Sequence, residues 1–176
     1  MFVVISTSLN PNSRSRVLAS AAHSILGATP EGSRLIDLAE TKLPFCDANE
    51  AYGDPNVVEV AAAIKSATGL LIATPVYNYN VSSSAKNLIE LTGKAWTDKV
   101  AGFLCAAGGF GSYMSCMGLA NSLMLDFHTV VLPRFVYATG DAFQGDQISD
   151  TDVEQRIQSL ADQLMAIARA TKPPEA

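Results

Sequence analysis

The sequence has the length of one globular domain and a charge that disfavours binding to nucleic acid. It has 176 residues, 48% hydrophobic and 16% charged, with twelve Lys and Arg against seventeen Asp and Glu. This composition allows one domain with a substantial core, and the net charge of -5 opposes attraction to nucleic acid or to an anionic membrane. We therefore expect one domain over residues 1–176, a frayed tail at 171–176, and partners that are small molecules or copies of the chain.

The N-terminus and the cysteines favour a cytoplasmic protein. Met1 to Ile5 lead directly into strand-like sequence, without the basic region and long apolar segment of a signal peptide. Cys46, Cys105 and Cys116 lack metal-ligand spacing, and an odd number of cysteines argues against a closed disulfide framework. We expect reduced thiols and no metal site.

Strand and helix patterns alternate along the chain, which is typical of a parallel sheet with helices on both faces. The expected strands are rich in apolar residues and cover residues 2–6, 33–37, 69–74, 100–106 and 129–136. The expected helices cover residues 15–26, 57–68, 83–96, 112–127 and 151–170. Right-handed crossovers favour the strand order 2-1-3-4-5. The sequence thus predicts an α/β, flavodoxin-like three-layer sandwich around a five-stranded parallel sheet.

Two of these helices begin with capping signals. Asn56 precedes the second helix with Glu59 three residues later, and Thr151 and Glu154 have the same spacing at the last helix. In the fourth helix, the methionines indicate either core packing or a subunit interface.

The strand order brings together the loops that follow strands 1, 3 and 4, at the edge where open α/β sheets bind ligands. The first loop, residues 6–15 (STSLNPNSRS), offers hydroxyls, backbone N–H groups and the dipole of the next helix to an anion such as a phosphate. It matches neither the P-loop nor the dinucleotide fingerprint. The alternative is a loop in which Ser13 or Ser15 only caps the helix.

The other two loops suit a flat ligand. The loop after the third strand (VYNYN, residues 76–80) holds two tyrosines and two asparagines that can lie along a ring system. Residues 108–112 (GGFGS) let the backbone approach a flat ligand and offer N–H groups to its carbonyl oxygens. These glycines can alternatively serve only a tight turn.

With these three loops, the chain resembles the NADPH-dependent FMN reductase family, a flavodoxin-like group that includes chromate- and azo-dye-reducing enzymes. The resemblance covers nearly the whole length and is carried by residues 8–15 (SLNPNSRS), 74–78 (TPVYN) with Lys86-Asn87, and 108–111 (GGFG). It implies bound FMN, with NADPH or NADH as co-substrate. The cofactor-binding residues that it implies are Ser8, Asn10, Ser13 and Ser15 at the phosphate, Pro75, Val76, Tyr77 and Asn78 along the isoalloxazine and ribityl chain, and Gly108, Gly109 and Gly111 near the ring.

Two arginines and two departures from the family pattern bear on this site. Arg14 is a further cofactor-binding candidate, because Arg14 and Arg16 are placed either to reach a 2′-phosphate or to lie on the helix surface. Asn10 stands where many members have Arg, which bears on phosphate binding and on the use of NADPH. Residues 82–83 (SS) stand where many members have Pro-Gly, which bears on the shape of the flavin loop.

The resemblance implies an oxidoreductase that transfers hydride from NAD(P)H to FMN and then to an acceptor, namely free flavin, a quinone, an azo compound or a metal oxyanion. We expect no catalytic side chain, because the cofactor carries the chemistry. The alternatives are a one-electron carrier of the flavodoxin type and a non-catalytic module that binds flavin or a partner. The family also implies a homodimer or homotetramer, with Trp96 and Tyr113 as interface candidates, or with Trp96 buried in its own monomer.

Overall fold

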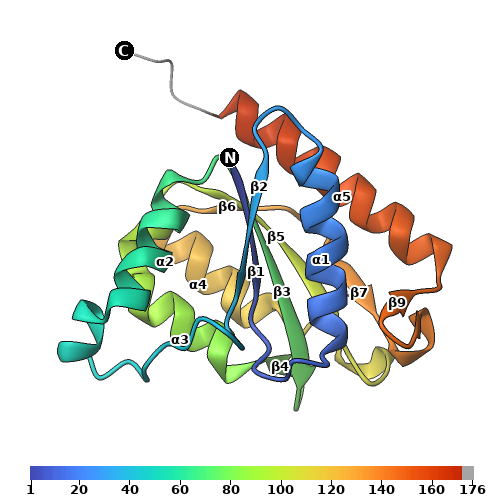
Figure 1. The fold of residues 1–176 in the computed structure, drawn as a ribbon, viewed down its shortest axis with the longest axis horizontal. Coiled ribbons are helices and arrows are strands. Elements are labelled where there is room, and N and C mark those ends of the chain that lie inside the picture. The colour runs from blue at the N-terminus through green and yellow to red at the C-terminus, as the bar shows by residue number, and fades with distance from the viewer. Residues whose placement is uncertain (172–176) are drawn as a thin grey trace.

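A parallel sheet runs through the middle of the molecule in the computed structural model, which describes residues 1–171 (Figure 1). Its strands follow the order β2-β1-β3-β5-β6, and β7 also pairs with β5. They are β1 (Phe2–Ser6), β2 (Ser33–Asp37), β3 (Leu70–Tyr77), β5 (Val100–Ala106), β6 (Val130–Val131) and β7 (Val136–Ala138). Every residue of β1 and β5 is buried, as expected for central strands that are covered on both faces. The predicted order holds for the five parallel positions.

The fifth position of the sheet differs from the continuous strand predicted over residues 129–136. β6 pairs with β5 at Val100 and Ala101, whereas β7 pairs with it from Leu104 to Ala106. Pro133 lies in the segment between the two pieces. Because proline has no N–H group to donate to the ladder, it interrupts the pairing and divides the strand in two.

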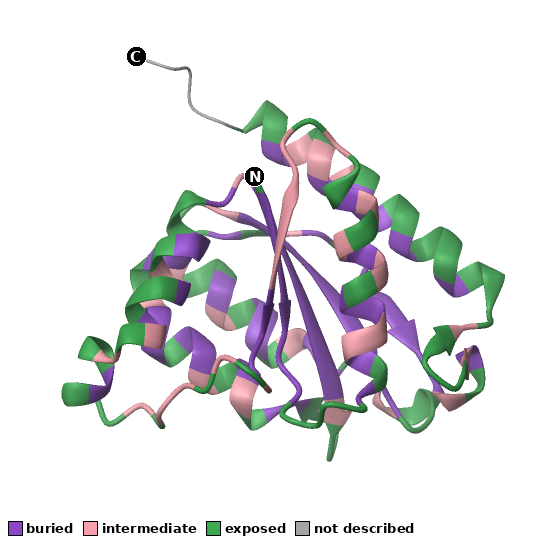
Figure 2. Cartoon of the chain, viewed as in Figure 1, coloured by how far each residue is buried: buried purple, intermediate pink, exposed green. Residues whose placement is uncertain are grey.

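Helices cover both faces of the sheet (Figure 1). One face carries α1 (Arg14–Gly27) and α5 (Thr151–Ala170), and the other carries α2 (Pro55–Ser66), α3 (Ser83–Thr92) and α4 (Met117–Phe127). Side chains of β1 alternate between the two cores, with Phe2 and Val4 toward α1 and α5, and Val3 and Ile5 toward the opposite face. Figure 2 shows the result, buried central strands between helices that are exposed on their outer sides, with the edge strand β2 only partly buried.

Both capping predictions are wrong by one or two residues. The N-cap of α2 is Asp54, whose carboxylate accepts hydrogen bonds from the backbone N–H groups of Asn56 and Val57, and Pro55 is the first helical residue. The N-cap of α5 is Asp150 rather than Thr151. In each case an aspartate just upstream accepts two backbone hydrogen bonds, which satisfies N–H groups that the helix leaves unpaired.

Two other helices are shorter than expected. α3 ends at Thr92 and continues as a 3₁₀ turn (Gly93–Trp96), because Gly93 adopts a left-handed conformation with φ of 36°. Trp96 is fully buried, and its indole N–H donates to Thr92 Oγ1 at 2.7 Å. This leaves Trp96 in the core of its own monomer, which was one of the two alternatives.

α4 begins at Met117 rather than at residue 112, because the preceding segment forms the glycine-rich loop and a 3₁₀ turn (Phe110–Ser112). The methionines of this region are mostly outside the core. Met114 and Met124 are exposed, whereas Met117 packs partly against the core.

The remaining elements are short. They are the antiparallel strand β4 (Asn80–Val81), a 3₁₀ turn before α2 (Glu50–Gly53), another at Gly140–Ala142, and a hairpin formed by β8 (Phe143–Gln144) and β9 (Gln147–Ile148). Thr171 is the C-cap of α5, so it does not belong to a frayed tail, and the rest of that expected tail, residues 172–176, lies outside the described residues. Between residues 1 and 171, no helix has the length and apolar character needed to cross a membrane.

Candidate functional site: three loops at the carboxyl edge of the sheet

The three candidate loops leave the sheet at the same edge, which is the lower edge in Figure 1. Ser6 at the end of β1 pairs with Ala73 of β3, and Pro75 of β3 pairs with Ala106 at the end of β5. Parallel pairing therefore places residues 7–15 (which include the first two residues of α1), the β3–β4 hairpin and residues 107–116 next to one another. We call these segments the first, second and third loops.

The first loop carries buried serine hydroxyls at the start of α1. Ser8, Ser13 and Ser15 are 2%, 8% and 0% exposed. Ser13 is the N-cap of α1, where its Oγ accepts from the Ser15 N–H group at 3.3 Å and lies 2.8 Å from Ser15 Oγ. Buried hydroxyls beside the positive end of a helix dipole are suited to an anion.

Asn10 folds the first loop through its own hydrogen bonds. Its backbone N–H donates to Ser8 Oγ at 3.2 Å, and its side-chain oxygen accepts from the Asn12 N–H at 3.0 Å. This local bonding is what asparagine provides in turns, so the residue that stands in place of arginine shapes the loop without adding charge. The first turn of α1 contains no acidic residue that would repel an anion. The serine hydroxyls and the N-terminus of the helix therefore fit a phosphate dianion.

The two arginines near the first loop contact neighbouring elements. Arg14 lies with its guanidinium 5.8 Å from the centroid of the Phe143 ring, a cation–π contact. Arg16 contacts Asp37 at 2.6 Å and Glu40 at 2.7 Å through its guanidinium nitrogens. Arg16 therefore forms ion pairs with two carboxylates. Arg14 packs against the segment that follows β7.

The second loop is a tight hairpin, which the sequence analysis did not predict. β3 continues to Tyr77, which pairs with Asn80 of β4 in antiparallel fashion. The two residues of the turn, Asn78 and Tyr79, have φ values of 49° and 61°, as a type I′ hairpin requires. Asparagine adopts this conformation readily, whereas an aromatic residue rarely does. Pro75 is buried and Val76 half-buried, while the Tyr77 and Tyr79 rings remain exposed at the rim.

The third loop presents open backbone. A Cβ atom added at Gly108 or Gly109 would meet nothing within 4 Å, and one added at Gly111 would lie 3.6 Å from the hydroxyl of Tyr79. The second and third loops are therefore in reach of each other. Tyr137 of β7 donates its hydroxyl proton to the Gly109 carbonyl oxygen at 2.6 Å, and burial raises the pKa of Tyr137.

The structure also shows three residues that sequence reasoning missed at this edge. Tyr137 anchors the third loop, and Thr7 and Ser82 form part of a buried hydroxyl cluster between the first two loops. None of them has a motif of its own, because their roles depend on partners far away in the sequence. Ser82 was noted only as a departure from the family pattern.

Lys86 and Asn87, the other motif residues, make their side-chain hydrogen bonds to segments outside the three loops. Lys86 pairs with Glu90 one turn later at 2.8 Å. The side chain of Asn87 accepts from the Cys46 N–H and donates to the Pro44 carbonyl oxygen, each at 2.9 Å. Asn87 therefore fixes the segment that precedes α2.

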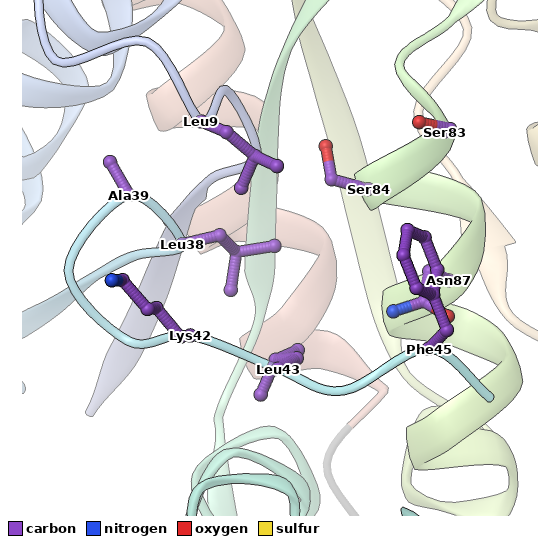
Figure 3. A pocket seen from close by; sticks show the side chains of 9 residues that line it. All are labelled: Leu9, Leu38, Ala39, Lys42, Leu43, Phe45, Ser83, Ser84 and Asn87. Carbon is purple, nitrogen blue, oxygen red and sulfur yellow. The ribbon is translucent and has the colours of Figure 1, made fainter.

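That segment closes a cavity of about 330 Å³ on the α3 side of the first loop (Figure 3). The side chains that line it are Leu9, Leu38, Ala39, Lys42, Leu43, Phe45, Ser83, Ser84 and Asn87. The cavity adjoins the three-loop site through Leu9 but contains none of its buried serines or glycines.

Two cysteines lie behind the third loop as buried free thiols, Cys105 on β5 and Cys116 just before α4. The neighbouring Cys116 thiol and burial raise the pKa of Cys105 well above its usual range, while Cys105 lowers the pKa of Cys116. Within residues 1–171, no group of three or more His, Cys, Asp and Glu side chains could hold a metal ion.

Comparison with known proteins agrees with this arrangement. The family model described as NADPH-dependent FMN reductase matches residues 1–144. An NAD(P)H:quinone oxidoreductase of Solanum tuberosum is 31% identical over 176 residues, covering 94% of this chain and 91% of that protein. An NAD(P)H-dependent FAD/FMN reductase of Geobacillus thermodenitrificans is 27% identical over 132 residues, covering 73% and 71% of the two chains.

Solved structures share the fold. FerB, a flavoenzyme NAD(P)H:(acceptor) oxidoreductase from Paracoccus denitrificans, superposes with a TM-score of 0.78 at 20% identity, covering 97% of each chain. A WrbA-like flavodoxin from Agrobacterium tumefaciens gives 0.70 at 18% identity, covering 97% of this chain and 98% of that one. The family match over most of the length, together with the potato relative, shows that the chain belongs to the NADPH-dependent FMN reductase family.

Proposed function

We propose that this protein is an FMN-dependent NAD(P)H oxidoreductase that delivers electrons to a quinone or to another small acceptor. The observation that carries the proposal is the placing of buried serine hydroxyls, an aromatic hairpin and an open glycine loop along one edge of the sheet. FMN, when bound there, supplies the two-electron chemistry. The quinone is favoured among acceptors because a potato relative is named NAD(P)H:quinone oxidoreductase and an Escherichia coli relative is named quinone reductase.

The first loop would bind the phosphate of the cofactor. Ser8, Ser13 and Ser15 offer hydroxyl donors at the N-terminus of α1, where no acidic side chain opposes an anion. Asn10 keeps the loop folded, and Arg14 adds positive charge from the first residue of the helix. Hydrogen bonds from neutral hydroxyls to a charged phosphate are stronger than those between neutral groups.

The second and third loops would hold the ring system. Residues 75–78 lie along one side, and the backbone at Gly108, Gly109 and Gly111 leaves room for a flat ligand and for hydrogen bonds to its carbonyl oxygens. Fixed donors at these positions stabilise negative charge that develops on the ligand. The nicotinamide and then the acceptor would use the exposed face in turn. We assign no side-chain acid or base.

We further propose a cytoplasmic homodimer or homotetramer. Phe45 and Leu125 are 86% and 79% exposed, and we take these two apolar side chains as candidate contacts with a second copy. Tyr113 remains an interface candidate because its side chain is partly exposed. Trp96 is no longer a candidate, because it is fully buried within the monomer. Light scattering of the purified protein should give twice or four times the monomer mass, and a monomer mass would contradict this proposal.

Kinetics and a matched pair of serine variants test the proposed function. Initial rates should be measured with NADPH or NADH varied at several fixed quinone concentrations. The double-reciprocal lines should be parallel, because the nucleotide and the quinone use the same exposed face of the ring in turn. Ser15→Ala should weaken FMN binding by about tenfold or more, since it removes a donor to a charged group. Ser24→Ala, an exposed position further along α1, should leave FMN binding unchanged.

Two results would contradict the proposal. The first is a purified protein that shows no quinone or flavin reduction with either nucleotide although it retains FMN. The second is a Ser15→Ala variant that binds FMN as tightly as the unmodified protein.

A further inference from the structure

Four hydroxyl groups form a cluster between the first and second loops. Ser82 lies at its centre, with its Oγ atom 3.2 Å from Thr7 Oγ1, 3.3 Å from Thr74 Oγ1 and 2.9 Å from Ser84 Oγ. The same oxygen accepts from the backbone N–H of Ala85 at 3.3 Å, because Ser82 is the N-cap of α3. One side chain thus joins the residue that follows β1, the parallel-paired part of β3 and the start of α3.

Ser82 differs from the two threonines because its hydroxyl proton can be donated within the cluster, whereas theirs go to backbone carbonyl oxygens. Thr7 donates its hydroxyl proton to the Ala73 carbonyl oxygen at 3.0 Å, and Thr74 donates to that of Pro75 at 3.1 Å. Each hydroxyl has a single proton but can accept two hydrogen bonds. The single proton of Ser82 can therefore go to Thr7 Oγ1 or to Thr74 Oγ1. Thr74 Oγ1 also accepts from the Ser82 backbone N–H at 3.2 Å, and the Ser82 oxygen accepts from α3.

Burial makes these bonds hard to replace. Thr7 and Thr74 are fully buried and Ser82 is 4% exposed. Water therefore has little access to the cluster, and a buried hydroxyl that loses its partner pays a desolvation cost. The Ser84 hydroxyl lies within hydrogen-bonding distance of both Ser82 Oγ and the backbone carbonyl oxygen of Thr7, and its single proton can go to either. Both the side chain and the main chain of Thr7 therefore face hydroxyls at the start of α3.

The position of the cluster connects it with the cofactor. Thr7 directly precedes Ser8 of the first loop, and Ser82 directly follows β4, which pairs with Val76 and Tyr77 of the second loop. The cluster therefore sets the separation between the segment proposed to hold the phosphate and the segment proposed to flank the ring. A ligand with both groups needs this separation, and a ligand with the ring alone does not.

We propose that Ser82 is a positioning residue for FMN, which holds the first and second loops at the spacing that lets one molecule bind through its phosphate and its ring together. The inference rests on the proposed function of the three-loop site.

Affinities for FMN and riboflavin separate this role from general stability. Riboflavin has the same ring and ribityl chain as FMN but no phosphate. Ser82→Ala should raise the Kd for FMN about tenfold, and the Kd for riboflavin by less than about twofold. Fluorescence quenching of each flavin by the purified protein measures both constants. Ser83→Ala is the matched control, because the Ser83 side chain is exposed and lies outside the cluster.

Two further variants keep the test decisive. Ser82→Thr retains the hydroxyl and should restore the preference for FMN over riboflavin. Thr7→Val keeps the shape of the side chain but removes its hydroxyl, and should reproduce the selective loss even if Ser82→Ala does not fold. The double variant Thr7→Val/Ser82→Ala should lose little more than either single variant, since both remove the same connection.

The outcomes distinguish the inference from the proposed function. An unchanged ratio of FMN to riboflavin affinity in Ser82→Ala and Thr7→Val, whether both affinities fall or neither does, would overturn the positioning role and leave the flavin site intact. Failure of the unmodified protein to bind FMN would overturn the proposed function itself, and the inference with it.

Discussion

Replacing Tyr137 with phenylalanine tests how the third loop is held. The change removes the hydroxyl that donates to the Gly109 carbonyl oxygen at 2.6 Å. It keeps the ring, whose centroid lies 5.3 Å from that of Tyr113 and 6.4 Å from that of Phe110. Gly109 is exposed, so its released carbonyl can accept from water. The loss should therefore be the net contribution of one hydrogen bond, about 1 kcal/mol.

This magnitude fixes two observable effects. For a chain of 176 residues, about 1 kcal/mol lowers Tm by roughly 2–4 °C. If the third loop contacts FMN, the same free energy is available to binding, and the Kd for FMN should rise by about fivefold. Thermal unfolding and fluorescence titration measure the two quantities. Tyr113→Phe is the control, because no hydrogen bond of the Tyr113 hydroxyl is present among residues 1–171.

Two results would refute this reasoning. Unchanged Tm and unchanged FMN affinity in Tyr137→Phe would mean that the hydrogen bond does not hold the loop. A loss of Tm well above 4 °C would mean that the hydroxyl supports core packing rather than the loop alone.

Three other predictions concern the scaffold. Gly102→Ala should lower the free energy of unfolding by about 1–3 kcal/mol, because the added Cβ would lie 3.0–3.1 Å from leucine side chains of β3 and α5; an unchanged urea midpoint would contradict it. Arg169 lowers the pKa of Glu31 from 4.5 to about 2, so this ion pair stabilises the native state above pH 4.5 and is lost as pH falls toward 2. The Tm difference between the unmodified protein and Glu31→Gln should accordingly vanish over that range, and its persistence at pH 2 would argue against the ion pair. Asn87→Ala should expose residues 44–46 to faster limited proteolysis, and an unchanged cleavage rate would show that the two side-chain hydrogen bonds do not hold this segment.

The sheet could be predicted because its signals are local. Apolar runs bounded by Gly and Pro identify buried strands, and the right-handed crossover rule then limits their order. The division of the fifth strand was also readable in principle from Pro133, which breaks a ladder. The hairpin at the end of β3 was not, because it depends on Tyr79 adopting a left-handed conformation that its residue type disfavours.

The three loops lie together at the carboxyl edge of the sheet, as the strand order predicts, but the contacts that fix them were not foreseen. Ser82 meets Thr7 across 75 positions of sequence, and Tyr137 reaches Gly109 across 28. Such pairs are set by tertiary packing and leave no periodic pattern in the sequence. Arg16 illustrates the same limit, since its partner Asp37 comes from the end of β2.

The central claim, that the three loops hold FMN for reduction by NAD(P)H, is tested most directly by anaerobic titration of the FMN-loaded protein while the visible absorbance of the flavin is followed. We predict that about one equivalent of NADPH or NADH removes the absorbance in a single two-electron step, and that a quinone then restores it. Retained absorbance after excess nucleotide would contradict the claim and leave a carrier or a flavin-binding module as the function of this chain.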